Sequence, residues 1–403
     1  MKQLRDYIKA HWKDTIRGPE HEAFERMPKP YITPCADEGF HNFFYWDTYF
    51  ANLGLMKDGY AEQAKNNLED MAFFIRNLGY MPNADQILFR SQPPLFTRGV
   101  YDYYAASGDK AFVKEMLPMI LKEFDFWHYD RNTPIGLNQY GTHEPKQGRV
   151  ACLKEFQKRV GENEEEKKLD QDELCKDFLS IAESGWDMTP RFAVPGNRFA
   201  EREFAPVDLN CILYDAEEKA AYLAKEIGEE ETSLSLQKKA KERKEKIERY
   251  LKDEESGLYL DYNFKRNCFS KIHSCVSFYP YALGISKDQE GARRLGKELT
   301  YPYGLSAAPY RGEDDYFQWD YPMMWPSNVY FAYTAYQNLG LKEEAHALKY
   351  LYQSTVEKVF QATGKLWEKY DSTTGEVAVS KEYKTPTMMG WTAGVYSYLD
   401  EEE

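Results

Sequence analysis

Two acidic side chains with aromatic neighbours are the residues of this sequence best suited to chemistry. Asp187 ends the segment 183–187, which reads Glu-Ser-Gly-Trp-Asp, and Glu368 lies in the segment 366–371, which reads Leu-Trp-Glu-Lys-Tyr-Asp. A carboxyl group held against an indole ring loses solvation, so its pKa rises and it can act as a general acid near neutral pH. Two separated carboxylates in such surroundings favour hydrolysis of a glycosidic bond, where one protonates the leaving oxygen and the other acts on the opposite face.

Each carboxylate also has a purely structural interpretation. Arg191 lies four residues after Asp187, and on a helix the two would form an ion pair that keeps the aspartate ionised. Glu368 could pair with Lys365 or Lys369 on an element that faces solvent. An inverting hydrolase would instead hold the two carboxyl groups roughly 6.5–9.5 Å apart, with a water molecule between them.

Two further segments place a tryptophan beside an aspartate. Trp46 and Asp47 lie in the segment 45–49, and Trp319 precedes another aspartate in the segment 318–322. A ring that stacks beside a hydrogen-bond acceptor suits one sugar unit. The alternatives are that Asp47 or Thr48 caps a following helix, and that Trp319 anchors a loop in the core.

Polar side chains next to prolines form a third kind of candidate. Arg90, Ser91 and Gln92 precede a Pro-Pro pair, which fixes the local backbone and would orient the side chains before it. Asn83 follows a proline and could bind hydroxyl groups. The alternatives are a surface loop with an exposed arginine and an asparagine that holds a turn.

The composition restricts the possible partners. The net charge of −14 argues against a nucleic acid, because phosphate binding needs clustered Lys and Arg. The aromatic content of 16%, with 32 Tyr and 8 Trp, fits a small carbohydrate ligand, since sugars stack their C–H faces on such rings. The alternative is that the rings fill a large helical core.

Cysteine spacing and apolar runs predict the compartment. The six cysteines show no Cys-x-x-Cys spacing and the seven histidines do not cluster, so we expect small core side chains in a reducing compartment and no metal site. The first residues are charged and lack the apolar stretch of a signal peptide. No run approaches about eighteen apolar residues, which predicts no membrane-spanning helix. We therefore expect a cytoplasmic protein with no membrane partner.

Helical periodicity dominates the chain. Apolar residues recur at spacings of three and four, which predicts helices at 61–78, 113–127, 208–227, 234–251, 329–339 and 342–360. Gly79 is a plausible C-cap of the first. Short turns with glycine join the helices into hairpins, which predicts an all-α closed toroid or an open solenoid. No fixed repeat length is visible, which counts against the solenoid.

We expect one domain over residues 1–403, with a charged excursion at about 146–174. Its run 159–172 is nearly all charged, which is typical of a solvated helix or a mobile segment. Loops at the ends of rigid helices carry binding groups. Five segments share Gly, Pro, Trp, Asn and Asp, so we expect them to converge on one site: 35–50, 80–96, 183–195, 318–326 and 365–394.

Motifs over about 34–394 resemble the trehalase family of glycoside hydrolases, in that family's order. Segment 45–50 resembles its Tyr-Trp-Asp-Ser-Tyr signature, and segment 90–94 its Arg-Ser-Gln-Pro-Pro loop. The resemblance implies an (α/α)6 barrel and an inverting α-glycosidase without metal or cofactor. The remaining matches are a Pro-Asn pair, the loops that carry the acid and the base, a second signature and a closing segment: 81–83, 183–187, 368–371, 318–325, 382–383 and 390–392.

The same resemblance implies residue roles. Asp187 would be the general acid and Glu368 the general base. Phe40 and Trp319 are added as aromatic candidates for substrate contact. The residues that would touch sugar by motif position are Trp46, Asp47, Asn83, Arg90, Ser91, Gln92, Gly185 and Glu382.

The sequence departs from the family at two places. Gly39 stands where a sugar-binding arginine is expected, and residues 142–144, Thr-His-Glu, stand nearest to the family's Arg-Pro-Glu loop. Unpaired hydroxyl groups would cost roughly 1–3 kcal/mol each. Trehalose is the leading substrate. The alternatives are glucosylglycerate, mannosylglycerate or an oligosaccharide end on the same fold, and a non-catalytic sugar-binding or scaffold protein. A phosphorylase would need a cationic phosphate pocket near the base.

Overall fold

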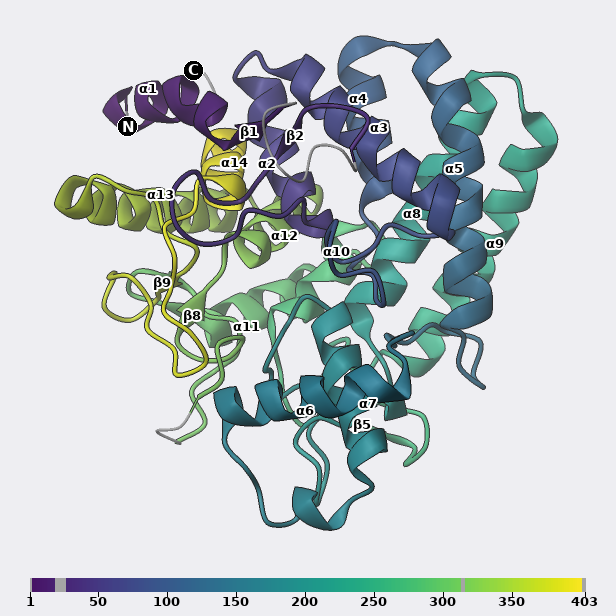
Figure 1. Cartoon of the computed structure of the whole chain (residues 1–403), viewed down its shortest axis with the longest axis vertical. Coiled ribbons are helices and arrows are strands. Elements are labelled where there is room, and N and C mark those ends of the chain that lie inside the picture. The colour runs from purple at the N-terminus through teal and green to yellow at the C-terminus, as the bar shows by residue number, and fades with distance from the viewer. Residues whose placement is uncertain (1, 19–26, 313–315, 401–403) are drawn as a thin grey trace.

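Helices make up most of the chain in the computed structural model, which describes residues 2–18, 27–312 and 316–400 (Figure 1). Within these ranges the strands are only two residues long. The all-α class expected from the sequence is therefore confirmed. No helix in the described ranges is long and apolar enough to cross a membrane.

An inner ring of helices forms the centre of the molecule. Each inner helix contacts the next, and the last packs extensively against the first, so the ring is closed. Closure confirms the toroid and excludes the open solenoid. In chain order the inner helices of the described residues are α2 (Tyr45–Lys57), α4 (Phe96–Ser107), α8 (Val207–Glu226), α10 (Tyr279–Ala282), α12 (Pro326–Asn338) and α14 (Gly390–Leu399).

Outer helices cover this ring. Four of them each pack on the inner helix that precedes them in the chain. The fifth, α11 (Gln289–Leu299), packs beside η5 (Cys275–Phe278). The outer partner of α14 is α1 (Lys2–His11), so both ends of the chain meet at the upper left of Figure 1. Arg5 pairs there with Asp400 at 2.9 Å. The other outer helices are α3 (Ala61–Leu78), α5 (Lys110–Asp130), α9 (Glu230–Tyr250), α11 (Gln289–Leu299) and α13 (Lys342–Thr363).

The expected helices are confirmed, with shifts of a few residues at their ends. The helix at 61–78 has the predicted bounds, and Gly79 caps it with φ of 93° and a hydrogen bond from its N–H to the carbonyl of Ile75. The inner helix α2 was not expected, because segment 35–50 was interpreted as a loop. All residues from Tyr45 to Leu55 are buried, so α2 is surrounded by protein and lacks the one-sided pattern that identifies an outer helix.

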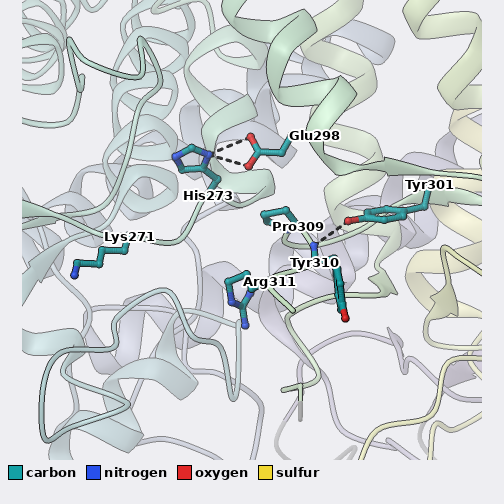
Figure 2. Close-up of a pocket in the computed structure, with 7 residues that line it drawn as sticks. All are labelled: Lys271, His273, Glu298, Tyr301, Pro309, Tyr310 and Arg311. Atoms are coloured by element: carbon teal, nitrogen blue, oxygen red, sulfur yellow. Dashed lines mark hydrogen bonds and ion pairs between the residues drawn. The ribbon is translucent and has the colours of Figure 1, made fainter. Parts of the chain in front are cut away.

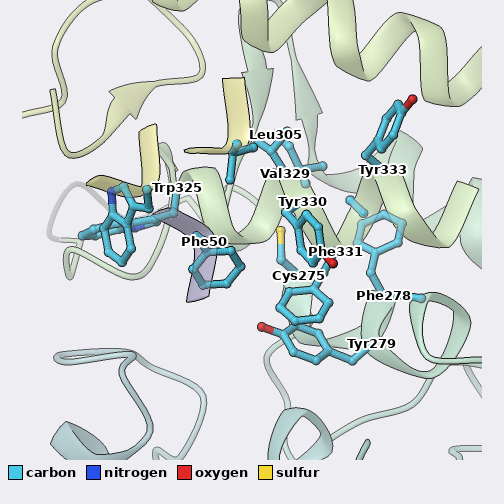
Figure 3. Packing of buried hydrophobic residues seen from close by; sticks show 14 of the residues in the cluster. Phe50, Cys275, Phe278, Tyr279, Leu305, Trp325, Val329, Tyr330, Phe331 and Tyr333 are labelled. Carbon is cyan, nitrogen blue, oxygen red and sulfur yellow. The ribbon is translucent and has the colours of Figure 1, made fainter. Parts of the chain in front are cut away.

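Aromatic rings pack between the inner helices (Figure 3). Tyr279 of α10 stacks on Phe331 of α12, with ring centres 3.8 Å apart. Phe50 of α2 meets Tyr330 of α12 edge to face at 5.7 Å. Such contacts each add about 0.5–1.5 kcal/mol beyond burial of area. Many of the aromatic rings therefore fill the core, which was the alternative explanation of the high aromatic content.

Short antiparallel ladders tie the loops together. The ladder of β8 (Met323–Met324) and β9 (Tyr370–Asp371) joins segment 318–326 to the segment that carries Glu368. The other strands pair β1 (Ile16–Arg17) with β2 (Tyr31–Ile32), β6 (Thr300–Tyr301) with β7 (Gly304–Leu305), and β4 (Tyr262–Asn263) with both β3 (Phe204–Ala205) and β5 (Cys268–Phe269).

The charged excursion lies beside the ring, at the bottom of Figure 1. It consists of α6 (Lys146–Val160), η3 (Glu166–Lys168) and the start of α7 (Gln171–Glu183), and α6 packs on α7 around its own apolar cluster. Run 159–172 forms no continuous helix. Instead, the buried Glu166 carboxylate accepts two hydrogen bonds of 2.9 Å from Arg198, which anchors the run to the body of the protein.

Candidate active site

A cavity of about 490 Å³ opens where the loops expected to converge meet. Its volume falls in the range of about 300–1,000 Å³ for small-molecule sites. The structure thus brings together side chains from five separate segments. All but two of the predicted site residues line it: Phe40, Trp46, Asp47, Asn83, Arg90, Gln92, Gly185, Asp187, Trp319 and Glu368.

Asp187 reaches the cavity just after the end of α7 and is half-buried. Burial raises the pKa of its carboxyl group, while the cations of Arg90 and Arg159 act in the opposite direction. The alternative pairing with Arg191 does not occur, because Arg191 binds two other buried aspartates, at 208 and 261. Asp187 is therefore available as a proton donor.

Glu368 lines the same cavity and its side chain is only 3% exposed. Its Oε1 accepts a hydrogen bond of 2.8 Å from the hydroxyl of Tyr383, and its Oε2 accepts one of 2.5 Å from Nζ of Lys369. The pairing with Lys369 was expected of a structural glutamate on a solvent-facing element. Here the pair exists but is buried at the cavity, while Lys365 pairs with Asp37 on the surface.

Asp47 lies in the first turn of α2 and lines the same cavity as the two candidate catalytic groups. Burial, with smaller contributions from the charges of Glu368 and Asp187, raises the pKa of Asp47 to about 8. Asp47 and Thr48 do not cap α2: the N-cap is Phe44, without a side-chain cap, and the Thr48 hydroxyl donates to the Phe44 carbonyl. Asp47 is thus available to bind a hydroxyl group.

A stack of indole rings forms one wall of the cavity. Trp319 stacks on Trp325 with ring centres 3.8 Å apart and lies 5.6 Å from Trp46. Gly185 allows this arrangement, because its φ is +73° and a Cβ placed there would lie 2.7 Å from the Trp46 ring. The glycine therefore lets the end of α7 approach α2 and brings Asp187 to the cavity.

Two predicted site residues, Ser91 and Glu382, lie behind the cavity instead of lining it. The Ser91 amide donates to Glu183 at 2.7 Å, and its hydroxyl donates to the carbonyl of Met81. Glu382 accepts a 3.1 Å hydrogen bond from the amide of Gln318. Both side chains hold cavity loops in place.

Several lining residues were not among the predicted ones. Tyr383 and Trp391 belong to the closing segment of the resemblance, so their motifs could have identified them. Arg159 comes from the last turn of α6, inside the run that was interpreted as solvated. No local signal distinguishes it, since its place at the cavity depends on how the excursion packs against the ring. Others are Asn42, Phe44, Gln318, Trp325 and Lys384.

The two departures from the family pattern have structural explanations. Gly39 lines the cavity with φ of +127°, and a Cβ there would lie 2.8 Å from Sγ of Cys35, so this loop has no room for an arginine. His143 lies 3.2 Å from Arg131, and Glu144 folds over α6 near Gly148. Neither is a lining residue of the cavity.

A second cavity, of about 440 Å³, has a different chemical character (Figure 2). Among the described residues that line it, the one carboxylate is Glu298, which hydrogen-bonds to Nδ1 of His273 at 3.0 Å. Lys271 supplies positive charge, Arg311 is paired with Asp320, and Tyr301 and Tyr310 supply rings. Of these two cavities, the first therefore suits a reaction that needs two carboxylates, and the second does not.

Comparisons with known proteins agree with this geometry. The trehalase family model matches residues 1–401. A periplasmic trehalase of Escherichia coli O1:K1 is 29% identical over 97% of this chain and 73% of its own length. A periplasmic trehalase of Shigella flexneri serotype 5b is 28% identical over the same shares.

Solved structures show the same fold. The neutral trehalase from Saccharomyces cerevisiae superposes with a TM-score of 0.75 at 24% identity, covering 97% of this chain and 78% of the yeast chain. A mannosylglycerate hydrolase from Thermus thermophilus in complex with glucose superposes with a TM-score of 0.68 at 17% identity, covering 98% of this chain and 99% of its own.

The relatives correct one expectation. A cytoplasmic location was predicted, but the relatives from Escherichia coli and Shigella flexneri are named periplasmic trehalases, so that prediction is wrong. The predicted location rested largely on the cysteine spacing, which was interpreted as a sign of free thiols in a reducing compartment. Cys35, Cys175, Cys211 and Cys275 are buried, and buried thiols are inert, so they carry no record of the redox state around the protein.

Proposed function

Because the chain belongs to the trehalase family, we propose that it is an inverting glycoside hydrolase that cleaves trehalose. The observation that carries the proposal is the pair Asp187 and Glu368, which line one cavity with different hydrogen-bond surroundings. One carboxyl group has a raised pKa and the other is a buried acceptor of two hydrogen bonds. Such a difference separates an acid from a base in glycoside hydrolysis.

In the proposed mechanism, Asp187 protonates the glycosidic oxygen while Glu368 takes a proton from the attacking water. The new C–O bond forms on the face opposite to the breaking one, so the configuration at the reacting carbon inverts. The Glu368 carboxylate is oriented by Tyr383 and Lys369 before the substrate arrives. Because the carboxylate is already oriented, less entropy is lost when it activates the water molecule.

Sugar recognition is assigned to the side chains that line the cavity. The rings of Trp46 and Trp319 offer apolar surface, and Arg90 offers a forked donor for hydroxyl groups. Gln92 is held in place, because its Oε1 accepts a 3.1 Å hydrogen bond from the amide of Trp46. Residues from both ends of the chain build the ring, so we propose that residues 1–403 act as a single catalytic domain.

Proton NMR of the first glucose released from trehalose tests the proposal. Inversion gives one β-glucose from the attacked unit and one α-glucose from the leaving unit, so equal amounts are expected before mutarotation. Two α-glucose molecules per turnover would contradict inversion. An Asp187→Asn preparation run in parallel controls for contaminating hydrolases.

A second candidate is the hydrolysis of a different small α-glucoside by the same two carboxylates. Gly39 favours this candidate, since its loop has no room for the arginine that the family places there. One leaving-group contact for trehalose is then lost. Assays on a panel of α-glucosides and α-mannosides separate the two candidates by their relative kcat/KM.

A further inference from the structure

Positive charge collects at the cavity of a protein that is acidic overall. The chain carries a net charge of −14, yet Arg90, Arg159 and Lys384 all line the cavity. Most other arginines are neutralised by carboxylates, as Arg149 is by Asp172 at 2.6 Å. A cluster of one sign inside a cleft raises the local concentration of ligands of the opposite sign.

None of these three cations forms an ion pair at contact distance with a carboxylate in the described part of the chain. Nε of Arg90 is buried and has no hydrogen-bond partner among the described residues. Arg159 and Lys384 are exposed at the mouth. Most buried donors in proteins are paired, so the unpaired Nε of a cavity-lining arginine points to a ligand that satisfies it.

The acidic side chains of the cavity do little to neutralise this charge. The pKa of Asp47 is raised to about 8, so its carboxyl group favours the neutral form near pH 7, and burial also raises the pKa of Asp187. Glu368 is paired with Lys369. The cavity therefore presents net positive charge to an arriving ligand.

The location of the cations identifies the part of the ligand that they meet. The charges of Arg90 and Arg159 both act on Asp187, the proposed proton donor. A general acid lies beside the leaving oxygen, while the base works on the opposite face of the sugar. Arg90 and Arg159 consequently lie on the leaving-group side of the cavity, to which the charged excursion contributes Arg159.

We propose that Arg159, with Arg90, selects an α-glucoside whose leaving group carries an anionic oxygen group, a carboxylate or a phosphate. This inference rests on the proposed glycosidase function and names its substrate class. The planar guanidinium fork matches two oxygens of either anion, and charge-assisted hydrogen bonds are about twice as strong as neutral ones.

Paired substrates test the inference. Glucosylglycerate and glucosylglycerol differ only in a carboxylate against a hydroxymethyl group, and trehalose 6-phosphate and trehalose differ only in a phosphate. We expect kcat/KM to be higher for the charged member of one pair by about tenfold or more. The pair that shows the preference identifies carboxylate or phosphate as the source. The preference should shrink as salt rises, because salt screens exposed charges.

Variants on α6 assign the preference to one side chain. Arg159→Gln should lower the charged-to-neutral ratio of kcat/KM by about ten- to a hundredfold, and Arg159→Lys should restore part of it. Lys158→Gln is the matched control, since Lys158 is exposed on the same turn, pairs with Glu155 and does not line the cavity. It should leave the ratio unchanged.

Hydrolysis of α-glucosyl fluoride separates the two levels of the proposal, because fluoride needs no leaving-group contacts. If the enzyme hydrolyses the fluoride but prefers the neutral member of both pairs, or if Arg159→Gln lowers both members equally, the inference is overturned and the glycosidase function stands. If the fluoride and every glycoside remain intact, the proposed function fails. Calorimetric titration of Asp187→Asn with each pair then still tests the anion preference by binding.

Discussion

Nζ of Lys369 lies 2.5 Å from Oε2 of Glu368, and the two side chains are 0% and 3% exposed. The ammonium group is also enclosed by rings, 4.3 Å from the centre of Tyr383 and 4.8 Å from that of Trp325. A buried carboxylate needs such a partner, because the low dielectric of the interior makes an uncompensated charge very unfavourable. Lys369 therefore compensates the charge of the proposed base where that base is buried beside aromatic rings.

Lys369→Met should lower both stability and activity. Removing one member of a buried ion pair leaves the other charge unpaired, which costs about 3–5 kcal/mol in the free energy of unfolding. Urea denaturation followed by circular dichroism measures that loss, and kcat on the best substrate measures the effect on the base. Lys365→Met is the control: its pair with Asp37 is exposed, and we expect a loss below about 1 kcal/mol. Equal losses in the two variants would contradict a special role for the Lys369 pair.

Asp187→Asn and Glu368→Gln should separate the acid from the base. Both variants should lower kcat on glycosides on the order of a thousandfold, because general acid and base groups each contribute about 10²–10⁴. On α-glucosyl fluoride, which leaves without protonation, Asp187→Asn should retain most of its activity and Glu368→Gln should not. The reverse order would exchange the two roles. No hydrolysis by the unsubstituted protein, with sugar binding that neither substitution changes, would support the non-catalytic sugar-binding protein.

Asp47 should make the protein less stable as pH rises. Its folded pKa of about 8 lies above the value near 3.9 of an unfolded aspartate, so between these values the folded state retains a proton that the unfolded state has lost. The free energy of unfolding then falls with rising pH across that window, by up to about 5 kcal/mol for this one group, and is unaffected by it below about pH 4. Asp47→Asn should shrink the difference between stabilities measured at pH 5 and pH 8.

Asp70 provides the matched control for that measurement. It lies on α3, does not line the cavity, and burial likewise raises its pKa to about 8. Asp70→Asn should shrink the same pH dependence while leaving kcat/KM unchanged, whereas Asp47→Asn should also lower kcat/KM. A stability profile that both substitutions leave unaltered would show that these carboxyl groups titrate normally in the folded protein.

The sequence was sufficient to predict the helices that face solvent on one side. The outer helix α3 was predicted with its bounds, because an apolar stripe at spacings of three and four alternates with charged residues. The inner helix α2 escaped the same test, since it is buried on all sides and lacks a polar, solvent-facing stripe. Ring closure depends on contacts between α2 and α14, which are more than three hundred residues apart, and no local pattern encodes such a contact.

The site shows the same division between local and long-range information. Asp187 and Glu368 were found because each lies in a motif with an aromatic neighbour, and the structure places both at one cavity. Ser91 and Glu382 share those motifs but face the loops behind it, since a motif does not fix the side on which each side chain projects. Arg159 was missed because a charged run indicates solvation unless packing carries its end to a cavity.

Gly185→Ala should disrupt both the fold and the site. Its φ of +73° is unfavourable for alanine, and the new Cβ would lie 2.7 Å from the Trp46 ring, so we expect a loss of about 2–4 kcal/mol in the free energy of unfolding. Gly228→Ala shares the strained φ, at +85°, but meets no atom within 4 Å, and should cost only about 1–2 kcal/mol. Because Asp187 follows two residues after Gly185, kcat should fall in the first variant and not in the second. Comparable stability losses, or full activity in Gly185→Ala, would mean that the approach of α7 to Trp46 does not position the acid.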